Sequence, residues 1–507
     1  MTEDNANLYA LLDARFVEAG DRTAFRMPDG SRMSYGALRA QVSRFANALK
    51  GFGVAPGDRV TVQVEKSLDN VALYLAVLKV GAVYQPLNTA YTPAEIDYFV
   101  SDAEPSLVVT TSARRASIDE IAAKRGVRAV ATLDGDGKGT LAEAAATAGS
   151  TCETAMRAGD DLAGLLYTSG TTGRSKGAML THDNLSSNAL TLHELWGFKP
   201  GDVLLHALPI FHVHGLYVAL NTAFLNGSEI IWLDRFDVDT VLRFLPEASV
   251  MMGVPTFYTR LLGDERFGRE VCRNMRLFVS GSAPMLAETH ETFAARTGLE
   301  ILERYGMTEC GMITSNPYEG ERVPGTVGYA LPGVSVRVAD GEGHEIPHGE
   351  VGIVECKGPN VFKGYWRMPE KTAEEFRADG YFITGDMGVM ADDGRVSIVG
   401  RGKDLIISGG FNVYPKEVET EIDQLPGIGE SAVIGVAHPD FGEGVVAVVT
   451  TGAGTPPSED EIISTLAERL AKFKVPKRVF YVDELPRNTM GKVQKAALKE
   501  RYADIFA

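Results

Sequence analysis

Residues 167–177 read Tyr-Thr-Ser-Gly-Thr-Thr-Gly-Arg-Ser-Lys-Gly, and this stretch says more about the fold than any other part of the chain. It contains three glycines, five serine or threonine hydroxyls and two cations, and it follows the apolar run 162–166 directly. Glycine lets a backbone turn sharply and bring its N–H groups close to an anion, while Arg174 and Lys176 add positive charge. We therefore predict a phosphate-binding loop after a buried strand. A flexible surface loop is the alternative, although such loops rarely follow a buried strand directly.

The order of residues in this loop excludes one large class of nucleotide-binding proteins. A Walker-type loop requires Gly-Lys-Ser/Thr after four spacer residues, whereas here Ser175 precedes Lys176 and Gly177 follows it. The run instead resembles the nucleotide signature of the adenylate-forming superfamily, which includes acyl-CoA synthetases, peptide-synthetase adenylation domains and luciferases. In that family the loop holds the β- and γ-phosphates of ATP. The resemblance implies this role for Thr168, Ser169, Gly170, Thr171, Thr172, Gly173 and Lys176.

Length and charge limit the other possibilities. A chain of 507 residues is too long for one core, so we expect a large domain and at least one smaller one. Its 50 basic and 67 acidic residues give a net charge of −17, which argues against nucleic-acid or anionic-membrane binding. The four cysteines lie far apart and suggest neither a zinc site nor a disulfide framework. With no visible signal peptide and no apolar stretch long enough to span a membrane, we predict a cytoplasmic protein.

The first third of the chain alternates helix and strand patterns. Ser34 is placed to cap a helix that ends near Gly51, and residues 60–64 alternate as in a strand. Residues 92–95 form a capping box with proline at the first helical position, and residues 107–109 read as the next strand. Repeated βα units predict an α/β fold with a largely parallel sheet. We expect only surface helices and loops over residues 111–160.

A domain boundary is predicted near residues 400–404. Asp392-Asp393-Gly394 is a turn signal between two short strands, and a compact α+β pattern of about a hundred residues follows the boundary. The resemblance implies a large N-terminal domain, 1–400, built from helix-covered, mostly parallel sheets plus a β-barrel-like part. A hinge at 401–404 would join it to a small mobile α+β domain, 405–507. Lys403 occupies the family's hinge position.

Two further motifs are implied to bind the nucleotide. The turn 280–284 follows an apolar strand, and in the family it lies against the adenine ring, which implies contacts from Gly281, Ser282, Ala283 and Pro284. The segment 303–309 matches the family pattern of an aromatic residue, Gly, a variable residue, Thr and Glu. Tyr305 would stack on adenine with Gly306 and Met307 beside it, Thr308 would touch the α-phosphate, and Glu309 would hold Mg²⁺.

The remaining motifs concern ribose, the reacting atoms and coenzyme A. Asp386 directly follows an apolar segment and is the family's ribose-binding carboxylate, and Arg401 would add a second contact to the nucleotide. Lys492, in the run 485–495, matches the family's catalytic lysine of adenylation. Because Lys492 and the phosphate loop lie in different domains, the domains must close to adenylate and then rotate. Gly409 and Gly410 would leave room for the pantetheine arm of coenzyme A.

The acid-binding pocket is predicted to be polar. Residues 207–215 should form part of it, and Arg304 stands where many relatives carry a small or neutral residue. A fixed guanidinium at the end of a short pocket suits a second carboxylate. His206, His212 and Arg235 are further candidates for acid binding.

Four segments resemble bacterial malonyl-CoA synthetases: 206–212, 314–320, 358–366 and 401–410. The implied reaction joins malonate to coenzyme A through malonyl-AMP, with AMP and pyrophosphate as products. Methylmalonate is a plausible second substrate, because one methyl group provides only about 1–3 kcal/mol of discrimination. The partners implied are small molecules (malonate, ATP and coenzyme A), and the enzyme is expected to be a monomer or homodimer.

Three other functions share the ATP motifs. An adenylation domain that charges a carrier protein would have a folded acceptor, but no carrier segment is attached to this chain. A luciferase-like oxygenase would bind a bulky aromatic acid, against which Arg304 argues. A non-catalytic nucleotide sensor would be expected to lack Glu309 or Lys492, and both are present.

Overall fold

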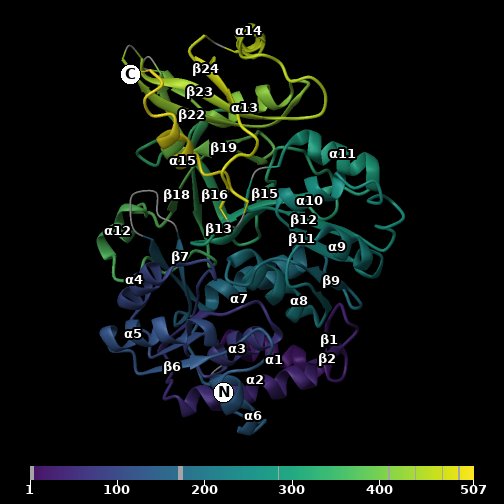
Figure 1. The fold of residues 1–507 in the computed structure, drawn as a ribbon, viewed down its shortest axis with the longest axis vertical. Coiled ribbons are helices and arrows are strands. Elements are labelled where there is room, and N and C mark those ends of the chain that lie inside the picture. Colours follow the sequence, from purple (N-terminus) through teal and green to yellow (C-terminus); the bar gives the residue numbers. More distant parts are fainter. Residues whose placement is uncertain are drawn as a thin grey trace.

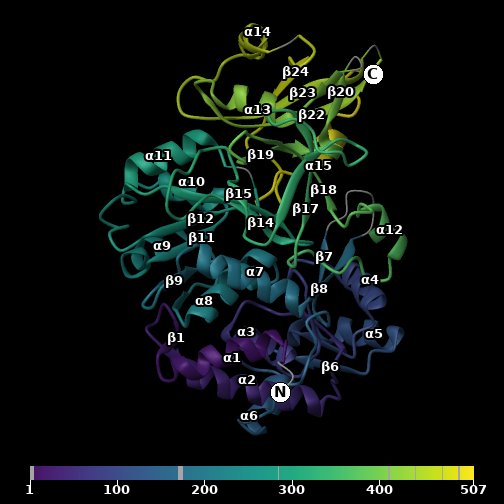
Figure 2. The ribbon, with the colours of Figure 1, turned by 180° about the vertical axis from the view of Figure 1, so that it is seen from behind.

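The computed structural model describes residues 5–168, 175–283, 285–408, 411–439, 441–470, 472–488 and 491–506. The chain forms mixed α/β layers in a large N-terminal domain and a small C-terminal domain at one end of it (Figure 1). Figure 2 shows the same order from behind: α1, α2 and α6 lie at the end of the molecule opposite to β22, β23 and β24.

The first sheet of the large domain carries the stretch that contains the predicted phosphate loop. Its strand order is β6–β5–β3–β4–β7–β8, and all neighbours are parallel except the last hairpin. The strands are β3 (Arg59–Gln63), β4 (Val83–Pro86), β5 (Leu107–Thr110), β6 (Ala129–Thr132), β7 (Leu162–Thr168) and β8 (Lys176–Thr181). The helices of this part are α1 (Leu8–Ala19), α2 (Tyr35–Gly51), α3 (Leu68–Lys79), α4 (Pro93–Ala103), α5 (Arg115–Arg125) and α6 (Thr140–Thr147), with the short η1 (Ser112–Arg114).

The second sheet is larger and also mostly parallel. Its order is β15–β14–β13–β12–β11–β9–β10–β1–β2. The strands are β1 (Thr23–Arg26), β2 (Arg32–Ser34), β9 (Val203–His206), β10 (Glu229–Trp232), β11 (Val250–Gly253), β12 (Leu277–Ser280), β13 (Ile301–Met307), β14 (Gly311–Ser315) and β15 (Tyr329–Ala330). The helices are α7 (His182–Leu195), the π-helix η2 (His214–Leu220), α8 (Asn221–Asn226), α9 (Val238–Phe244), η3 (Leu245–Glu247), α10 (Pro255–Leu262) and α11 (Ala287–Thr297).

The part expected to resemble a β-barrel is a four-stranded antiparallel sheet in the order β16–β17–β18–β19. Its strands are β16 (Ser335–Ala339), β17 (Val351–Lys357), β18 (Phe382–Met390) and β19 (Val396–Arg401), and α12 (Pro369–Glu374) precedes β18. The sheet lies between the two mostly parallel sheets and the small domain (Figure 1).

The small domain has its own apolar core around Val418, Val433 and Val445. Its sheet pairs β21–β20–β23–β22, with β24 parallel to β23. The elements are η4 (Gly402–Asp404), β20 (Ile406–Ser408), β21 (Phe411–Val413), α13 (Pro415–Asp423), β22 (Ile428–His438), β23 (Gly442–Thr451), α14 (Glu459–Arg469), β24 (Arg478–Tyr481) and α15 (Lys495–Arg501). Helix α13 packs against β19 of the large domain.

Local predictions agree with these elements in most places. Ser34 caps α2, and the capping box at Thr92 is formed with Glu95. The turn at 392–394 joins β18 to β19. One expectation was wrong: residues 111–160 contain strand β6 at the sheet edge, where Ala129–Thr132 are too weakly apolar to stand out in the sequence. Among the described residues no helix is both long and apolar enough for a membrane span, and all four cysteines are free.

Candidate functional site

Strands β7 and β8 form the two sides of the predicted phosphate loop. Thr168 and Lys176 are opposite each other at the end of this hairpin, and residues 169–174 lie outside the described part of the chain. Helix α4 holds both sides: the Tyr98 hydroxyl donates to the Ser175 carbonyl at 2.6 Å, and the Tyr167 hydroxyl donates to Asp102 Oδ2 at 2.5 Å. The ends of the loop are therefore fixed by one helix.

Lys176 joins a network of partly buried charges. Its Nζ donates to Glu375 Oε1 at 2.8 Å and lies 3.9 Å from the centre of the Tyr365 ring. The Tyr365 hydroxyl lies 2.6 Å from Glu375 Oε2 and 3.1 Å from Glu309 Oε1, so its single proton lies between two carboxylates. Burial raises the pKa of Glu309, which the Tyr365 hydrogen bond and the positive charge of Lys176 partly offset. The predicted metal ligand and the predicted phosphate lysine thus share one polar network.

A second cluster lies where β13 meets the antiparallel sheet. The Tyr305 hydroxyl donates to Asp386 Oδ2 at 2.5 Å, and Arg401 Nε lies 2.8 Å from Asp386 Oδ1. Asp386 and Arg401 are cross-strand partners in β18 and β19, so the sheet register sets their pairing. Beside them, the backbone passes Gly306 so closely that an added Cβ would lie 2.1 Å from the Gly311 carbonyl oxygen. Met307 ends β13, and Thr308 follows it.

Arg304 is a buried charge whose hydrogen-bonding groups are only partly paired. It points from β13 into the protein, is 4% exposed, and leaves Nε and Nη2 without a hydrogen-bond partner. Burial lowers the pKa of its guanidinium to about 9, so it stays charged at neutral pH. Buried charges are ordinarily paired, and this pair of unpartnered N–H groups therefore indicates a site for an anion.

Two histidines lie beside Arg304. Burial lowers the pKa of His212 to about 3, with further contributions from the positive charges of Lys492 and Arg304. His214 is buried, its Nδ1 lies 3.3 Å from Ser282 Oγ, and its Nε2 has no partner. Burial and the positive charge of Arg304 lower the pKa of His214 as well. Both imidazoles are neutral at pH 7, which leaves Arg304 as the charge that an anion would meet here.

Lys492 reaches this region from the small domain. It lies in a tight turn in which its backbone N–H donates to Asn488 Oδ1, and Gly491 approaches Thr256 of α10 so closely that an added Cβ would lie 3.3 Å from Thr256 Oγ1. Solvent reaches the Lys492 side chain, yet protein atoms surround it closely enough that burial lowers its pKa, and the positive charge of Arg401 lowers it further. Asp386 and Glu309 oppose that shift. The small domain is therefore closed on the large one.

The structure does not bring every predicted residue into this cluster. His206 lies near enough to His214 to affect its pKa, but its own contacts are with other groups: its ring stacks on Trp232, its Nε2 lies 2.9 Å from the Gly215 carbonyl oxygen, and Lys66 Nζ lies 3.1 Å from its Nδ1. Arg235 is exposed in the segment after β10. Lys403 is exposed in η4 between the domains. Pro284, Gly409 and Gly410 lie outside the described residues, as do Ser169, Gly170, Thr171, Thr172 and Gly173.

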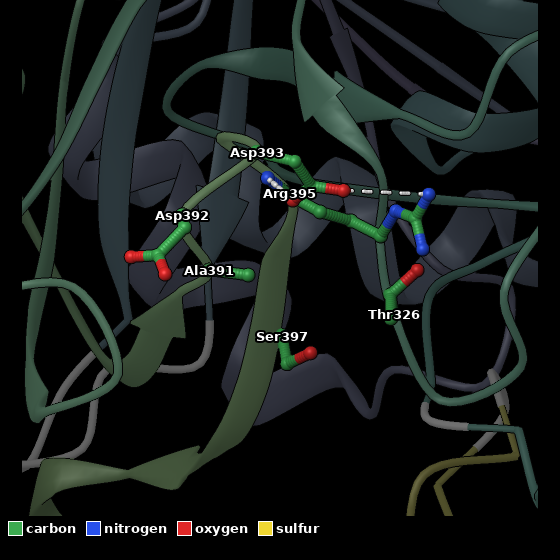
Figure 3. A pocket seen from close by; sticks show the side chains of 6 residues that line it. All are labelled: Thr326, Ala391, Asp392, Asp393, Arg395 and Ser397. Carbon is green, nitrogen blue, oxygen red and sulfur yellow. Dashed lines mark hydrogen bonds and ion pairs between the residues drawn. The ribbon is translucent and has the colours of Figure 1, made fainter.

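A hollow of about 380 Å³ lies away from these clusters. Short polar side chains of the β18–β19 turn and Thr326 line it, with Arg395 ion-paired to Asp393 (Figure 3). None of the predicted site residues lines this hollow. We therefore assign it no part in the chemistry.

Several residues of the site were not predicted from the sequence. Glu375 follows α12 among other charged residues, where nothing distinguishes it from a solvated carboxylate. Tyr98 and Asp102 belong to an ordinary amphipathic helix. His214 was predicted only as part of the pocket segment 207–215, and Tyr365 had no predicted role; only the packing of distant segments shows what they contact.

Comparison with known proteins agrees with the arrangement of these clusters. Residues 12–366 match the model of the family described as AMP-binding enzyme, and residues 417–492 match the AMP-binding enzyme C-terminal domain. The chain is 34% identical to a malonate–CoA ligase from Arabidopsis thaliana, over 98% of this chain and 90% of that protein. It is 35% identical to a feruloyl-CoA synthase from Amycolatopsis sp, over 93% of this chain and 94% of that protein.

Solved structures give a closer match. The crystal structure of ATP-bound MatB from Rhodopseudomonas palustris has a TM-score of 0.96 and 56% sequence identity, and covers 99% of this chain and 100% of that one. The apo form of the same protein has a TM-score of 0.86. The family match extends over most of the chain, and the relatives match it nearly end to end. The chain therefore belongs to the AMP-binding enzyme family.

Proposed function

We propose that this enzyme ligates malonate to coenzyme A, using ATP and releasing AMP and pyrophosphate through a malonyl-AMP intermediate. The observation that carries the choice of acid is Arg304, whose buried guanidinium keeps two unpartnered nitrogens. Its neighbours His212 and His214 are neutral, so a second carboxylate would meet one strong positive charge. The similarity to a malonate–CoA ligase supports the same substrate.

The nucleotide roles proposed from sequence agree with the two polar clusters. Asp386 would accept both ribose hydroxyls, and its contacts with Tyr305 and Arg401 orient the carboxylate. The Tyr305 ring would lie along adenine, with the turn of Gly281, Ser282, Ala283 and Pro284 nearby. Thr308 would contact the α-phosphate. The phosphate loop, from Thr168 to Gly173, and Lys176 would hold the outer phosphates.

Glu309 is chemically suited to Mg²⁺. Mg²⁺ in nucleotide sites takes one or two protein carboxylates and completes its coordination with water and phosphate oxygens. Within the described part of the chain no cluster of three potential metal ligands occurs, so a single buried carboxylate beside the phosphate-binding elements fits this pattern. Mg²⁺ bound there would reduce the negative charge of the outer phosphates. Tyr365 would keep Glu309 oriented toward it.

The chemical step depends on positive charge rather than on a base. A carboxylate has a reference pKa of about 4, so malonate is already a nucleophile at neutral pH. The barrier is the approach of one anion to another, and Lys492 would lower it by contacting both the acid and the α-phosphate. Its neighbours Arg401, Arg304, Asp386 and Glu309 surround the same space.

We further propose that two conformations separate the two half-reactions. The proposed division is a large domain 1–400, a hinge 401–404 with Lys403, and a small domain 405–507. The short η4 between β19 and β20 supports this boundary. Rotation about the hinge would withdraw Lys492 and bring Gly409 and Gly410 toward the acyl-adenylate, where the pantetheine thiol attacks.

An acid panel tests the proposed substrate. We expect AMP release with coenzyme A to be fastest with malonate, slower with methylmalonate and succinate, and slowest with acetate, octanoate and ferulate. Ferulate is included because a feruloyl-CoA synthase is about as similar in sequence as a malonate–CoA ligase. Faster turnover of ferulate or octanoate would show that Arg304 does not select a diacid.

The clamp formed by α4 gives a prediction about ATP. Tyr98→Phe removes the hydroxyl that donates to Ser175 but keeps the ring that lies against Phe99. One such hydrogen bond contributes about 1 kcal/mol, so we expect the KM for ATP to rise roughly fivefold with the KM for malonate unchanged. Tyr91→Phe, on a ring that also packs on Phe99, is the matched control. Equal changes in both KM values would contradict a role confined to the loop.

The remaining predictions concern the setting of the enzyme. A free carrier protein as the acceptor would be revealed by activity with a phosphopantetheinyl carrier that exceeds activity with coenzyme A. We also predict that the enzyme is cytoplasmic and a monomer or homodimer. Fractionation of cells and measurement of the mass in solution test these two points.

A further inference from the structure

The turn after β12 leaves space for one side chain of β13. A Cβ added to Gly281 would lie 2.4 Å from Cζ and Nη1 of Arg304 and 2.7 Å from its Nε. Interatomic contacts this short are not tolerated, so any other residue at 281 must move the guanidinium or the turn. The head of Arg304 thus occupies the volume that a side chain at position 281 would require.

Backbone conformation does not explain a glycine at this position. Gly281 is not among the glycines with positive φ, so its torsions are ones that alanine adopts readily. The next residue, Ser282, has a φ of 72°, in the region that favours glycine. The glycine of this turn is therefore at position 281, where space is restricted, and not at position 282, where the backbone is strained.

The guanidinium has little freedom to move aside. Arg304 is buried on β13 with Gly281 on one side, and Tyr258 and His214 lie close enough for its positive charge to lower their pKa values. The Tyr258 hydroxyl is held by the Val279 carbonyl at 2.6 Å. The His214 ring is buried beside Ser282. A Cβ at position 281 would therefore displace the guanidinium within a packed interior rather than into solvent.

We propose that Gly281 is a specificity-determining residue, because its missing side chain fixes the position of the Arg304 guanidinium and thereby admits an acid with a second carboxylate. This inference rests on the proposed function of Arg304 as the diacid-binding group. It differs from the adenine contact that family resemblance implies for Gly281. Its consequence is that Gly281 and Arg304 act as one unit, which a double-mutant cycle measures.

The first test is Gly281→Ala. Misplacing a binding group by about 1 Å costs up to a hundredfold, so we expect kcat/KM for malonate to fall roughly tenfold to a hundredfold. The loss should be larger in kcat/KM for malonate than in the KM for ATP, because the three atoms nearest to the added methyl group all belong to Arg304. Gly341→Ala is the control, since a Cβ there meets nothing within 4 Å. Wild-type malonate activity in Gly281→Ala would overturn the proposal.

The second test places Gly281→Ala in an Arg304→Leu background and also measures Tm. Leucine has no atoms where the guanidinium lies, so the added methyl group should lower Tm in the wild-type background and leave it nearly unchanged in the Arg304→Leu background. Equal loss of Tm in both backgrounds would show that Gly281 is constrained by something other than Arg304. The Tm comparison needs no substrate, so it separates failure of this inference from failure of the proposed function. If Arg304→Leu alone keeps full malonate activity, the proposed function fails.

Discussion

Replacing Arg304 by leucine is expected to lower kcat/KM for malonate by roughly a thousandfold, the largest effect that we expect from one change in the acid pocket. Removing one partner of a buried, hydrogen-bonded charge pair costs several kcal/mol, because the other charge is left without a counter-ion. The guanidinium of Arg304 is a buried positive charge near two neutral histidines, His212 and His214. Turnover is measured as AMP release at varied malonate.

The same variant should keep its affinity for ATP. Asp386, Tyr305 and Arg401 contact one another without Arg304, so the KM for ATP is expected to change less than about threefold. Arg235→Leu is a useful comparison, because that exposed arginine was a candidate on sequence grounds alone and should change malonate turnover little. Near wild-type malonate turnover in Arg304→Leu would remove the basis for a diacid substrate. A large loss in Arg235→Leu would mean that the acid enters by a different route.

Much of the fold was predictable because its signals are local. The helix capped by Ser34, the capping box at Thr92 and the hairpin at 392–394 depend on residues within a few positions of each other. The secondary structure of the small domain followed from apolar periodicity in the same way. Strand β6 was missed because an edge strand buries less surface and carries a weaker apolar pattern.

The sequence predicted the residues of the candidate site only where they belong to a recognisable motif. Arg304 and Glu309 share one motif, but Asp386 and Lys492 are far from it in sequence, and the structure brings all four around one space. Local sequence patterns do not distinguish His206 from His212, since the two histidines flank the same apolar run, 207–211. Their surroundings differ because Lys66 and Trp232 enclose His206, whereas His212 faces Arg304 and Lys492.

Residues that act through others were harder still to predict. Glu375 becomes important only because Lys176 and Tyr365 reach it from other elements. Gly281 belongs to a recognised turn, yet its closest neighbour is the head of a side chain on the next strand. Such roles depend on side-chain direction and packing, which local sequence patterns do not determine.

Lys492→Ala is expected to reduce formation of malonyl-AMP by roughly a hundredfold or more, the loss typical of removing one group that stabilises transition-state charge. Burial and the positive charge of Arg401 lower the pKa of Lys492, while Asp386 and Glu309 help to keep its ammonium charged. An alanine there leaves the carboxylate and the α-phosphate to approach each other with less positive charge between them. Pyrophosphate–ATP exchange in the presence of malonate measures this step alone. Lys499→Ala, on α15 of the same domain, is the control.

The second half-reaction should proceed almost normally in the same variant. When malonyl-AMP is supplied, coenzyme A attacks an activated carbonyl, and the proposed rotation has already withdrawn Lys492 from that space. We therefore expect thioester formation within about threefold of the wild-type rate. A variant that loses adenylation but keeps thioester formation indicates a residue that acts in only one of the two conformations. If both half-reactions fall equally, Lys492 either acts in both or stabilises the fold, and a change in Tm distinguishes these two. The close approach of Gly491 to Thr256 would then be explained more simply by an enzyme that catalyses both steps in the closed conformation, without rotation of the small domain.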